Sequence, residues 1–188
     1  MSTNGPTPLP IGAPAPAFDL PAVDGGRVAL SDFGDAPAWV YVQGCNHCPV
    51  VLAYVDRLKA LQESYRDRGV RFVMVNANDA ERYPDDDFEA MVRFAREHDL
   101  PFPYLHDPDQ SVARAYRTVR TPEVLLFGPD GTLRYHGRID DAKDPAEVRS
   151  HDLRDAIEAV LAGRAPTEPE TWAVGCTVKW KPGNEPAA

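Results

Sequence analysis

The chain has 188 residues, enough for one domain with a sizeable core, and its 43% hydrophobic and 26% charged residues are typical of globular proteins. Its net charge of −9 argues against nucleic acid or a membrane surface as a partner. The 19 prolines crowd both ends. We therefore predict a flexible lead-in at 1–10, one domain at 11–163 and a proline-rich tail at 164–188.

The N-terminus shows neither a basic region nor an apolar run, so no signal peptide is visible and we expect a cytoplasmic location. No stretch approaches the length of a membrane-spanning helix. The chain has three cysteines: Cys45, Cys48 and Cys176. In a reducing compartment they indicate redox or metal chemistry rather than structural disulfides.

Hydrophobic periodicity predicts strands that alternate with helices. Apolar runs on either side of Asp24-Gly25-Gly26 predict an N-terminal hairpin. The later strands are expected at 39–42, 70–75, 101–105, 124–127 and 133–139. Helices are expected from Pro49 to near Gly69, at 85–98, at 110–116 and after Ser150 as an N-cap. This order predicts an α/β fold with a central mixed sheet.

The motif Cys45-Asn46-His47-Cys48 lies where the strand 39–42 gives way to a helix. Two cysteines at this spacing lie on adjacent turns, close enough to form a disulfide. We expect Cys45 at the open helix end, where the macrodipole lowers a thiol pKa. His47 adds positive charge, which would make the pair more oxidising. Cys48 would resolve a mixed disulfide on Cys45.

Two other interpretations compete with a redox pair. The cysteines could be buried and inert, although the position between strand and helix argues against this. They could also form half of a zinc site, with further ligands from Cys176 and one histidine. The histidines open to that role are His98, His106, His136 and His151.

The motif at 45–49, Arg120-Thr121-Pro122-Glu123 before a strand, and Gly128-Pro129-Asp130-Gly131 after it resemble the thioredoxin-like superfamily. Together with the entry 13–20 they resemble its redoxin branch, which includes alkyl-hydroperoxide reductase and thiol-specific antioxidant (AhpC/TSA) relatives. The resemblance implies a three-layer α/β/α fold. The segment 175–181 resembles the tail of a subgroup of peroxiredoxin-like proteins.

The resemblance further implies a cis Thr121-Pro122 bond beside Cys45, with the Thr121 backbone free to pair with an extended substrate. An ordinary trans proline at a strand entry is the alternative. Thioredoxins carry a buried aspartate six residues before the first cysteine, where this chain has Trp39. By similarity to related disulfide reductases we expect Asp79, or else Glu81, to accept the Cys48 proton, unless both are only solvated loop residues.

A peroxiredoxin-like peroxidase is the rival enzyme, with Cys45 peroxidatic and Cys48 or Cys176 resolving. Peroxiredoxins place a threonine or serine three residues before the peroxidatic cysteine, where this chain has Val42. The arginine that stabilises the thiolate in peroxiredoxins would fall on or near Pro122 in this sequence, and Arg120 lies close by. Both departures put peroxidase activity in doubt.

Cys176 follows a proline-rich linker and lies between Trp172 and Trp180. The tail could fold back and present a third thiol to Cys45 or Cys48, or its tryptophans could pack it with the cysteine idle. Lys179 would raise the local positive potential.

We therefore predict a thiol-disulfide oxidoreductase with Cys45, His47, Cys48 and Pro122 as its site and with no cofactor beyond an electron donor. Its partners would be protein or small-molecule disulfides, or peroxides, and a thiol reductant such as thioredoxin or glutathione. The third alternative is a redox-sensing or zinc-binding module without turnover.

Overall fold

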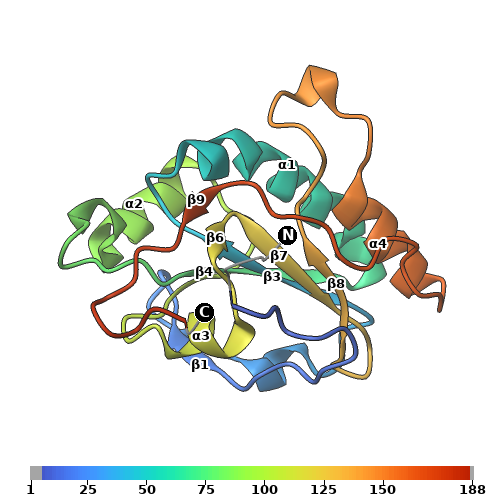
Figure 1. Cartoon of the computed structure of the whole chain (residues 1–188), viewed down its shortest axis with the longest axis horizontal. Coiled ribbons are helices and arrows are strands. Elements are labelled where there is room, and N and C mark those ends of the chain that lie inside the picture. Colours follow the sequence, from blue (N-terminus) through green and yellow to red (C-terminus); the bar gives the residue numbers. More distant parts are fainter. Residues whose placement is uncertain (1–5, 187–188) are drawn as a thin grey trace.

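The computed structural model describes residues 6–186, and its centre is a five-stranded mixed sheet in the order β5-β4-β3-β7-β8 (Figure 1). The strands β3, β4 and β5 pair in parallel, whereas β7 runs antiparallel to both β3 and β8. The strands are β1 (Asp19–Pro21), β2 (Arg27–Ala29), β3 (Trp39–Gly44), β4 (Arg71–Asn76), β5 (Tyr104–His106), β6 (Arg120–Thr121), β7 (Glu123–Phe127), β8 (Leu133–Gly137) and β9 (Cys176–Thr177). The α-helices are α1 (Pro49–Tyr65), α2 (Phe88–Glu97), α3 (Ser111–Tyr116) and α4 (Asp152–Leu161).

The predicted α/β class with a central mixed sheet is confirmed, and β1 and β2 form the expected antiparallel hairpin. Strand β3 is buried along its whole length because its side chains alternate between two hydrophobic clusters. Val40 and Val42 pack with α1, α2 and α4, whereas Trp39 and Tyr41 pack on the opposite face with α3 and the N-terminal segment. The sheet therefore forms the middle of three layers.

The N-terminal segment is part of this packing. Leu9 is buried in the second cluster, and the Gly12 N–H donates to the Leu133 carbonyl at 2.8 Å. The prediction of a flexible lead-in at 1–10 is therefore wrong from Leu9 onward, because an apolar side chain and backbone hydrogen bonds hold the segment against β8. Residues 1–5 lie outside the described part of the chain.

Two helix starts differ from the prediction. Helix α2 begins at Phe88, three residues late, because the Asp87 side chain accepts a hydrogen bond from Ala90 N–H at 2.7 Å and so caps it. Ser150 does not cap α4, since its hydroxyl instead donates to the Asp152 carboxylate at 3.0 Å. The N-cap position of α4 belongs to His151.

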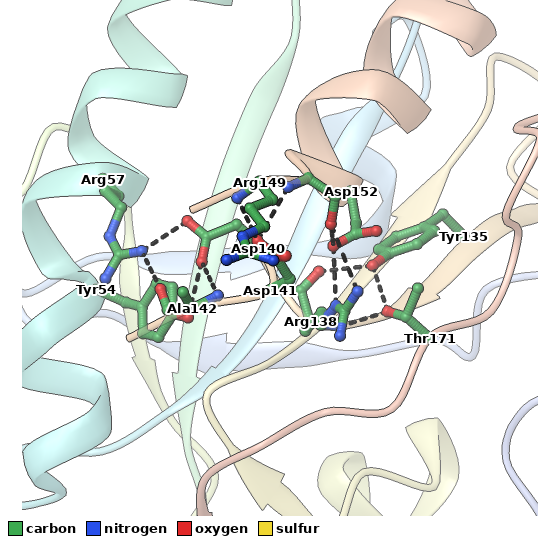
Figure 2. Close-up of polar contacts among 11 residues, drawn as sticks. Tyr54, Arg57, Tyr135, Arg138, Asp140, Asp141, Ala142, Arg149, Asp152 and Thr171 are labelled. Atoms are coloured by element: carbon green, nitrogen blue, oxygen red, sulfur yellow. Dashed lines mark hydrogen bonds and ion pairs between the residues drawn. The ribbon is translucent and has the colours of Figure 1, made fainter. Parts of the chain in front are cut away.

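The C-terminal tail is docked on the domain. Its Thr171 hydroxyl lies 2.6 Å from the Tyr135 hydroxyl and accepts from Arg138 N–H at 3.0 Å, beside the Arg138–Asp152 ion pair (Figure 2). Further on, strand β9 pairs antiparallel with β6, which directly precedes β7, so that the tail crosses beside the start of β7 (Figure 1).

The tail folds back onto the domain, which is one of its two predicted states. Trp172 is 67% exposed and does not pack the tail in place. Backbone hydrogen bonds and the buried side chains of Ala173 and Val178 hold it instead. Among residues 6–186, none of the helices has the length and apolar character needed to cross a membrane.

Candidate active site

The two motif cysteines lie between the end of β3 and the start of α1. Cys48 is the N-cap of α1 and Pro49 its first residue, where the missing N–H of proline costs no hydrogen bond. Cys45 lies three residues before the N-cap of α1. The expectation that Cys45 occupies the N-terminus of this helix is therefore wrong, because Cys48 is the residue there. Both sulfurs are buried, with Cys45 1% and Cys48 0% exposed.

The charge on the pair is also reversed from the prediction. A hydrogen bond from the Cys45 thiol lowers the pKa of Cys48 to about 4, helped by hydrogen bonds from Cys176 and from the Val51 backbone. The pKa of Cys45 is raised by that same bond to Cys48, by burial and by the negative charge of Asp86. The reduced pair therefore holds one proton on Cys45 and its negative charge on Cys48, at the helix N-terminus.

Thr121 and Pro122 lie against both sulfurs, as expected. The Thr121-Pro122 peptide bond is cis, which confirms that prediction. The Cys48 sulfur lies 3.2 Å from the Thr121 carbonyl oxygen, and the Cys45 thiol lies 3.6 Å from the Thr121 hydroxyl. Thr121 thus contacts each cysteine through a different group.

His47 lies on the Cys45 side of the motif. Its Nδ1 is 2.5 Å from an oxygen of Asp86, a close polar contact that is not aligned as a hydrogen bond. The ring also stacks on Tyr83 with centroids 6.0 Å apart. His47 therefore faces a carboxylate as well as Cys45.

Asp86 is the site residue that the sequence did not reveal. It is fully buried, and its oxygens accept from Asn46 N–H at 2.7 Å, Asn76 Nδ2 at 3.1 Å and Asn78 Nδ2 at 2.8 Å. In the sequence it is the middle member of three consecutive aspartates, with no local signal that separates it from its neighbours.

Asp79 and Glu81 do not serve the role expected for them. The Asp79 carboxylate is buried but accepts a hydrogen bond from Glu81 N–H at 3.2 Å. The Glu81 side chain is exposed and pairs with Lys181 at 3.3 Å. The carboxylate that acts on the cysteine pair is Asp86, through its charge on Cys45.

The residues considered for peroxide chemistry lie elsewhere. Val42 is fully buried within β3 and packs in the core. The Arg120 guanidinium donates to the Gly175 carbonyl at 3.5 Å, in the tail. The hydroxyl that contacts the Cys45 sulfur, at 3.6 Å, belongs to Thr121 rather than to the position three residues before the cysteine.

Cys176 joins the site from the tail. Its sulfur lies 2.7 Å from the Cys48 sulfur, and its position opposite Thr121 in the β6–β9 pair fixes it there. Burial and the neighbouring Cys48 raise its pKa. Of the two alternatives for this residue, the structure supports a third thiol presented to Cys48.

The structure brings three predicted zinc ligands together, Cys45, Cys48 and Cys176, but none of the four predicted histidines belongs to the metal-sized group found among the described residues. Within residues 6–186, the group of three side chains close enough to share a metal ion is Cys45, His47 and Asp86, whose ligand atoms lie within 4.8 Å. Asp86 already accepts three N–H donors. His136, one of the expected ligands, instead pairs with Glu123 at 2.5 Å.

A cavity of about 110 Å³ lies beside Pro122, with walls from Val50, Tyr54, Ile139 and Val174 of the tail. Its lining also includes charged residues, Arg138, Asp140, Asp141 and Lys143. A larger cavity of about 540 Å³ lies by Phe33 and Phe72 at the opposite end of β4. No cysteine lines either cavity, but the smaller one borders Pro122, which follows the Thr121 that contacts both sulfurs. The smaller cavity is therefore the one placed to take a substrate side chain.

The profile of the AhpC/TSA family matches residues 11–136. Thiol-disulfide oxidoreductase ResA of Oceanobacillus iheyensis is 28% identical over 129 residues, which are 65% of this chain and 62% of that protein. The chain thus spans somewhat less than two thirds of that relative. An uncharacterised conserved protein of Geobacillus kaustophilus has a crystal structure with 40% identity and a TM-score of 0.88, over 93% of this chain and 94% of its own. The thioredoxin domain of a Bacteroides vulgatus thiol-disulfide oxidoreductase shares the fold, with a TM-score of 0.63 at 20% identity over 80% and 96% of the two chains.

Proposed function

Because the chain belongs to the AhpC/TSA family and has a thioredoxin-like fold, we propose that it is a thiol-disulfide oxidoreductase whose redox pair is Cys45 and Cys48. The observation that carries the proposal is the pair itself. Two neighbouring cysteines are buried at or just before the N-terminus of α1, and both lie against Thr121. This is the arrangement that disulfide exchange requires, since the thiolate is the attacking species.

In the reducing direction, a thiolate of the pair attacks one sulfur of a substrate disulfide. A mixed disulfide forms, and the other half of the substrate leaves as a thiolate. The second cysteine then attacks the protein sulfur of the mixed disulfide, which closes the Cys45–Cys48 disulfide and releases the remaining substrate thiolate. The one proton of the reduced pair and one proton from water end on the two substrate sulfurs, and two electrons pass to the substrate.

The surroundings of the pair support this chemistry. The hydrogen bond to Cys48, burial and the nearby Asp86 together raise the pKa of Cys45, whereas the same hydrogen bond lowers the pKa of Cys48. The cavity beside Pro122 provides a place for one side chain of a peptide disulfide, whereas the backbone edge at Thr121 is paired with the tail strand β9. ResA is named a thiol-disulfide oxidoreductase, which is consistent with the same activity here.

The test is reduction of insulin disulfides with dithiothreitol as the electron source. Wild type should be active, and Cys45→Ser and Cys48→Ser should each lose the activity, because either change removes one half of the pair. If wild type is no more active than either variant, the protein does not turn over disulfides, and the redox-sensing module becomes the favoured function.

The peroxidase remains an alternative that one further measurement separates. Stopped-flow oxidation of the reduced protein by hydrogen peroxide should be no faster than that of a free thiolate, since Val42 offers no hydroxyl to hold the peroxide. A much faster rate would favour the peroxidase. The cytoplasmic location, and thioredoxin or glutathione as the reductant, stay predictions.

A further inference from the structure

The tail occupies the place that a substrate strand would take. Strand β9 pairs antiparallel with β6, with Cys176 opposite Thr121 and Thr177 opposite Arg120. The Val178 N–H donates to the Val119 carbonyl at 3.0 Å and extends the pairing by one residue. The tail therefore uses the backbone edge next to the redox pair in the way that an extended peptide would.

The close approach depends on a glycine. A side-chain carbon on Gly175 would collide with the carbonyl group of Thr121. Beyond β9, the Lys179 N–H donates to Asn78 Oδ1 at 2.9 Å, and Asn78 in turn donates to Asp86. The tail is thus tied to the polar network of the site on one side of Cys176 and to Thr171 and its partners on the other.

This docking places Cys48 next to both other sulfurs. Cys48 contacts the Cys45 thiol on one side, and on the other its sulfur is 2.7 Å from that of Cys176. Cys45 and Cys48 are buried, whereas Cys176 is partly exposed. Of the three, Cys176 is the sulfur that an external thiol can reach while the tail is docked.

We propose that Cys176 is a third redox-active cysteine, which exchanges disulfides with Cys48 and passes reducing equivalents from an external dithiol to the buried pair. This inference rests on the proposed function, which supplies the oxidised Cys45–Cys48 disulfide. The tail strand acts as a tethered substrate that holds the third sulfur beside Cys48.

Exchange begins when the Cys176 thiolate attacks the Cys48 sulfur. The Cys48–Cys176 bond forms as the Cys45–Cys48 bond breaks, and Cys45 leaves as a thiolate that takes up the proton Cys176 has lost. One disulfide and one thiol are present before and after, so this step needs no oxidant. The external dithiol then attacks Cys176 and frees Cys48. Its second thiol closes its own disulfide and releases Cys176, so the protein gains two electrons and the dithiol is oxidised.

The first experiment maps disulfides after incubation with oxidised glutathione, acid quench, alkylation and peptide mass spectrometry. Cys45→Ser should yield a Cys48–Cys176 crosslink. Its matched control, Cys48→Ser, should yield Cys45 and Cys176 as separate peptides. Cys176→Ser should still form Cys45–Cys48. If Cys45→Ser yields Cys48 and Cys176 on separate peptides while Cys176→Ser still forms the Cys45–Cys48 disulfide, the inference about Cys176 is wrong and the proposed function stands. Loss of Cys45–Cys48 in Cys176→Ser would overturn the proposed function and the inference with it.

A second experiment tests the docking. Adding Gly175→Ala to Cys45→Ser should lower the effective concentration of Cys176 at Cys48 at least ~10-fold, measured as the ratio of crosslink to glutathione adduct. Gly34→Ala is the control, because its backbone is right-handed with φ −63° and an added side-chain carbon would meet the Ser31 carbonyl at an ordinary 3.5 Å. Equal crosslinking in both variants would contradict a role for the strand pairing.

A third experiment follows the reduction of the oxidised protein by dithiothreitol. Cys176→Ser should be reduced at least ~10-fold more slowly than wild type, because the reductant must then reach a buried sulfur directly. Equal or faster reduction of Cys176→Ser would show that electrons bypass the tail and would overturn the inference.

Discussion

The two sulfurs of the pair border different kinds of structure. On the Cys45 side, Asp86 is fully buried and gathers N–H donors from three asparagines that belong to the domain itself. On the Cys48 side, the border is the tail, which reaches the site 128 residues later in the chain and is held by backbone hydrogen bonds.

The two borders differ in how easily they can be displaced: the Asp86 side is fixed in the domain, whereas the tail can detach. Releasing Asp86 would leave several buried polar groups unpaired, which is costly. The tail can leave with a smaller loss, because its carbonyl and N–H groups can exchange protein partners for water. We therefore expect the Cys45 side to determine stability and charge, and the Cys48 side to determine access. Four changes test this difference, in order of decreasing effect.

Asp86→Ala should have the largest effect. It removes the acceptor of three N–H groups, and each buried group left unpaired costs about 1–3 kcal/mol. The free energy of unfolding in urea should fall by about 3 kcal/mol or more. The neighbour Asp85 is exposed, so Asp85→Ala should change it by at most about 0.5 kcal/mol. Equal losses of unfolding free energy in Asp86→Ala and Asp85→Ala would contradict a stabilising role for the Asp86 side of the site.

The charge distribution is tested by titrating the thiolate absorbance in the ultraviolet. Because the pKa of Cys48 is lowered to about 4, the reduced wild-type protein should keep one thiolate from neutral pH down to that value and lose it as the pH falls further. Cys45→Ala removes the strongest stabilising hydrogen bond and should raise that pKa by at least a unit, about 1.4 kcal/mol.

Cys176→Ser is the comparison for this titration and should raise the pKa of Cys48 less than Cys45→Ala does, since the hydrogen bond from Cys176 is the weaker contribution. A wild-type thiolate that appears only near the ordinary thiol pKa of about 8.5 would show that the pair is not activated.

Thr171→Val should loosen the tail and leave the Asp86 side intact. It removes the hydrogen bonds to Tyr135 and Arg138 (Figure 2), and a loss of about 1.4 kcal/mol corresponds to about 10-fold faster hydrogen exchange at the Val178 amide. The Asn46 amide, bonded to Asp86, should keep its protection. Thr177→Val is the control, because its hydroxyl is exposed and accepts only from Lys179 at 3.4 Å. Faster hydrogen exchange at the Asn46 amide as well would mean that the tail and the Asp86 side of the site open together as one cooperative unit.

Glu81→Gln should have the smallest effect. The Glu81–Lys181 pair joins the tail to the domain, but the carboxylate is 84% exposed and solvent screens it. Exchange at the Val178 amide should change by less than about 3-fold, equivalent to about 0.6 kcal/mol. An effect as large as that of Thr171→Val would show that surface charge, rather than backbone pairing, holds the tail.

Local patterns account for most of the fold and for part of the site. The unbroken apolar run at 39–42 indicated a strand covered on both faces, and Asp24-Gly25-Gly26 indicated the hairpin turn; both are confirmed. Pro122 was placed beside the cysteines by resemblance, and Thr121 contacts both sulfurs. Asp86 could not be found in this way, because its role depends on asparagines at 46, 76 and 78 that only the folded chain brings together.

The sequence by itself determined that two thiols stand between a buried strand and a helix, since that follows from spacing and periodicity within a few residues. Only the tertiary structure decided which thiol carries the charge and where the third one lies. Both depend on contacts between distant segments: Asp86 disfavours charge on Cys45, and Gly175 lets the tail pair with β6 and bring Cys176 to Cys48. Such contacts arise from packing and carry no local signature in the chain.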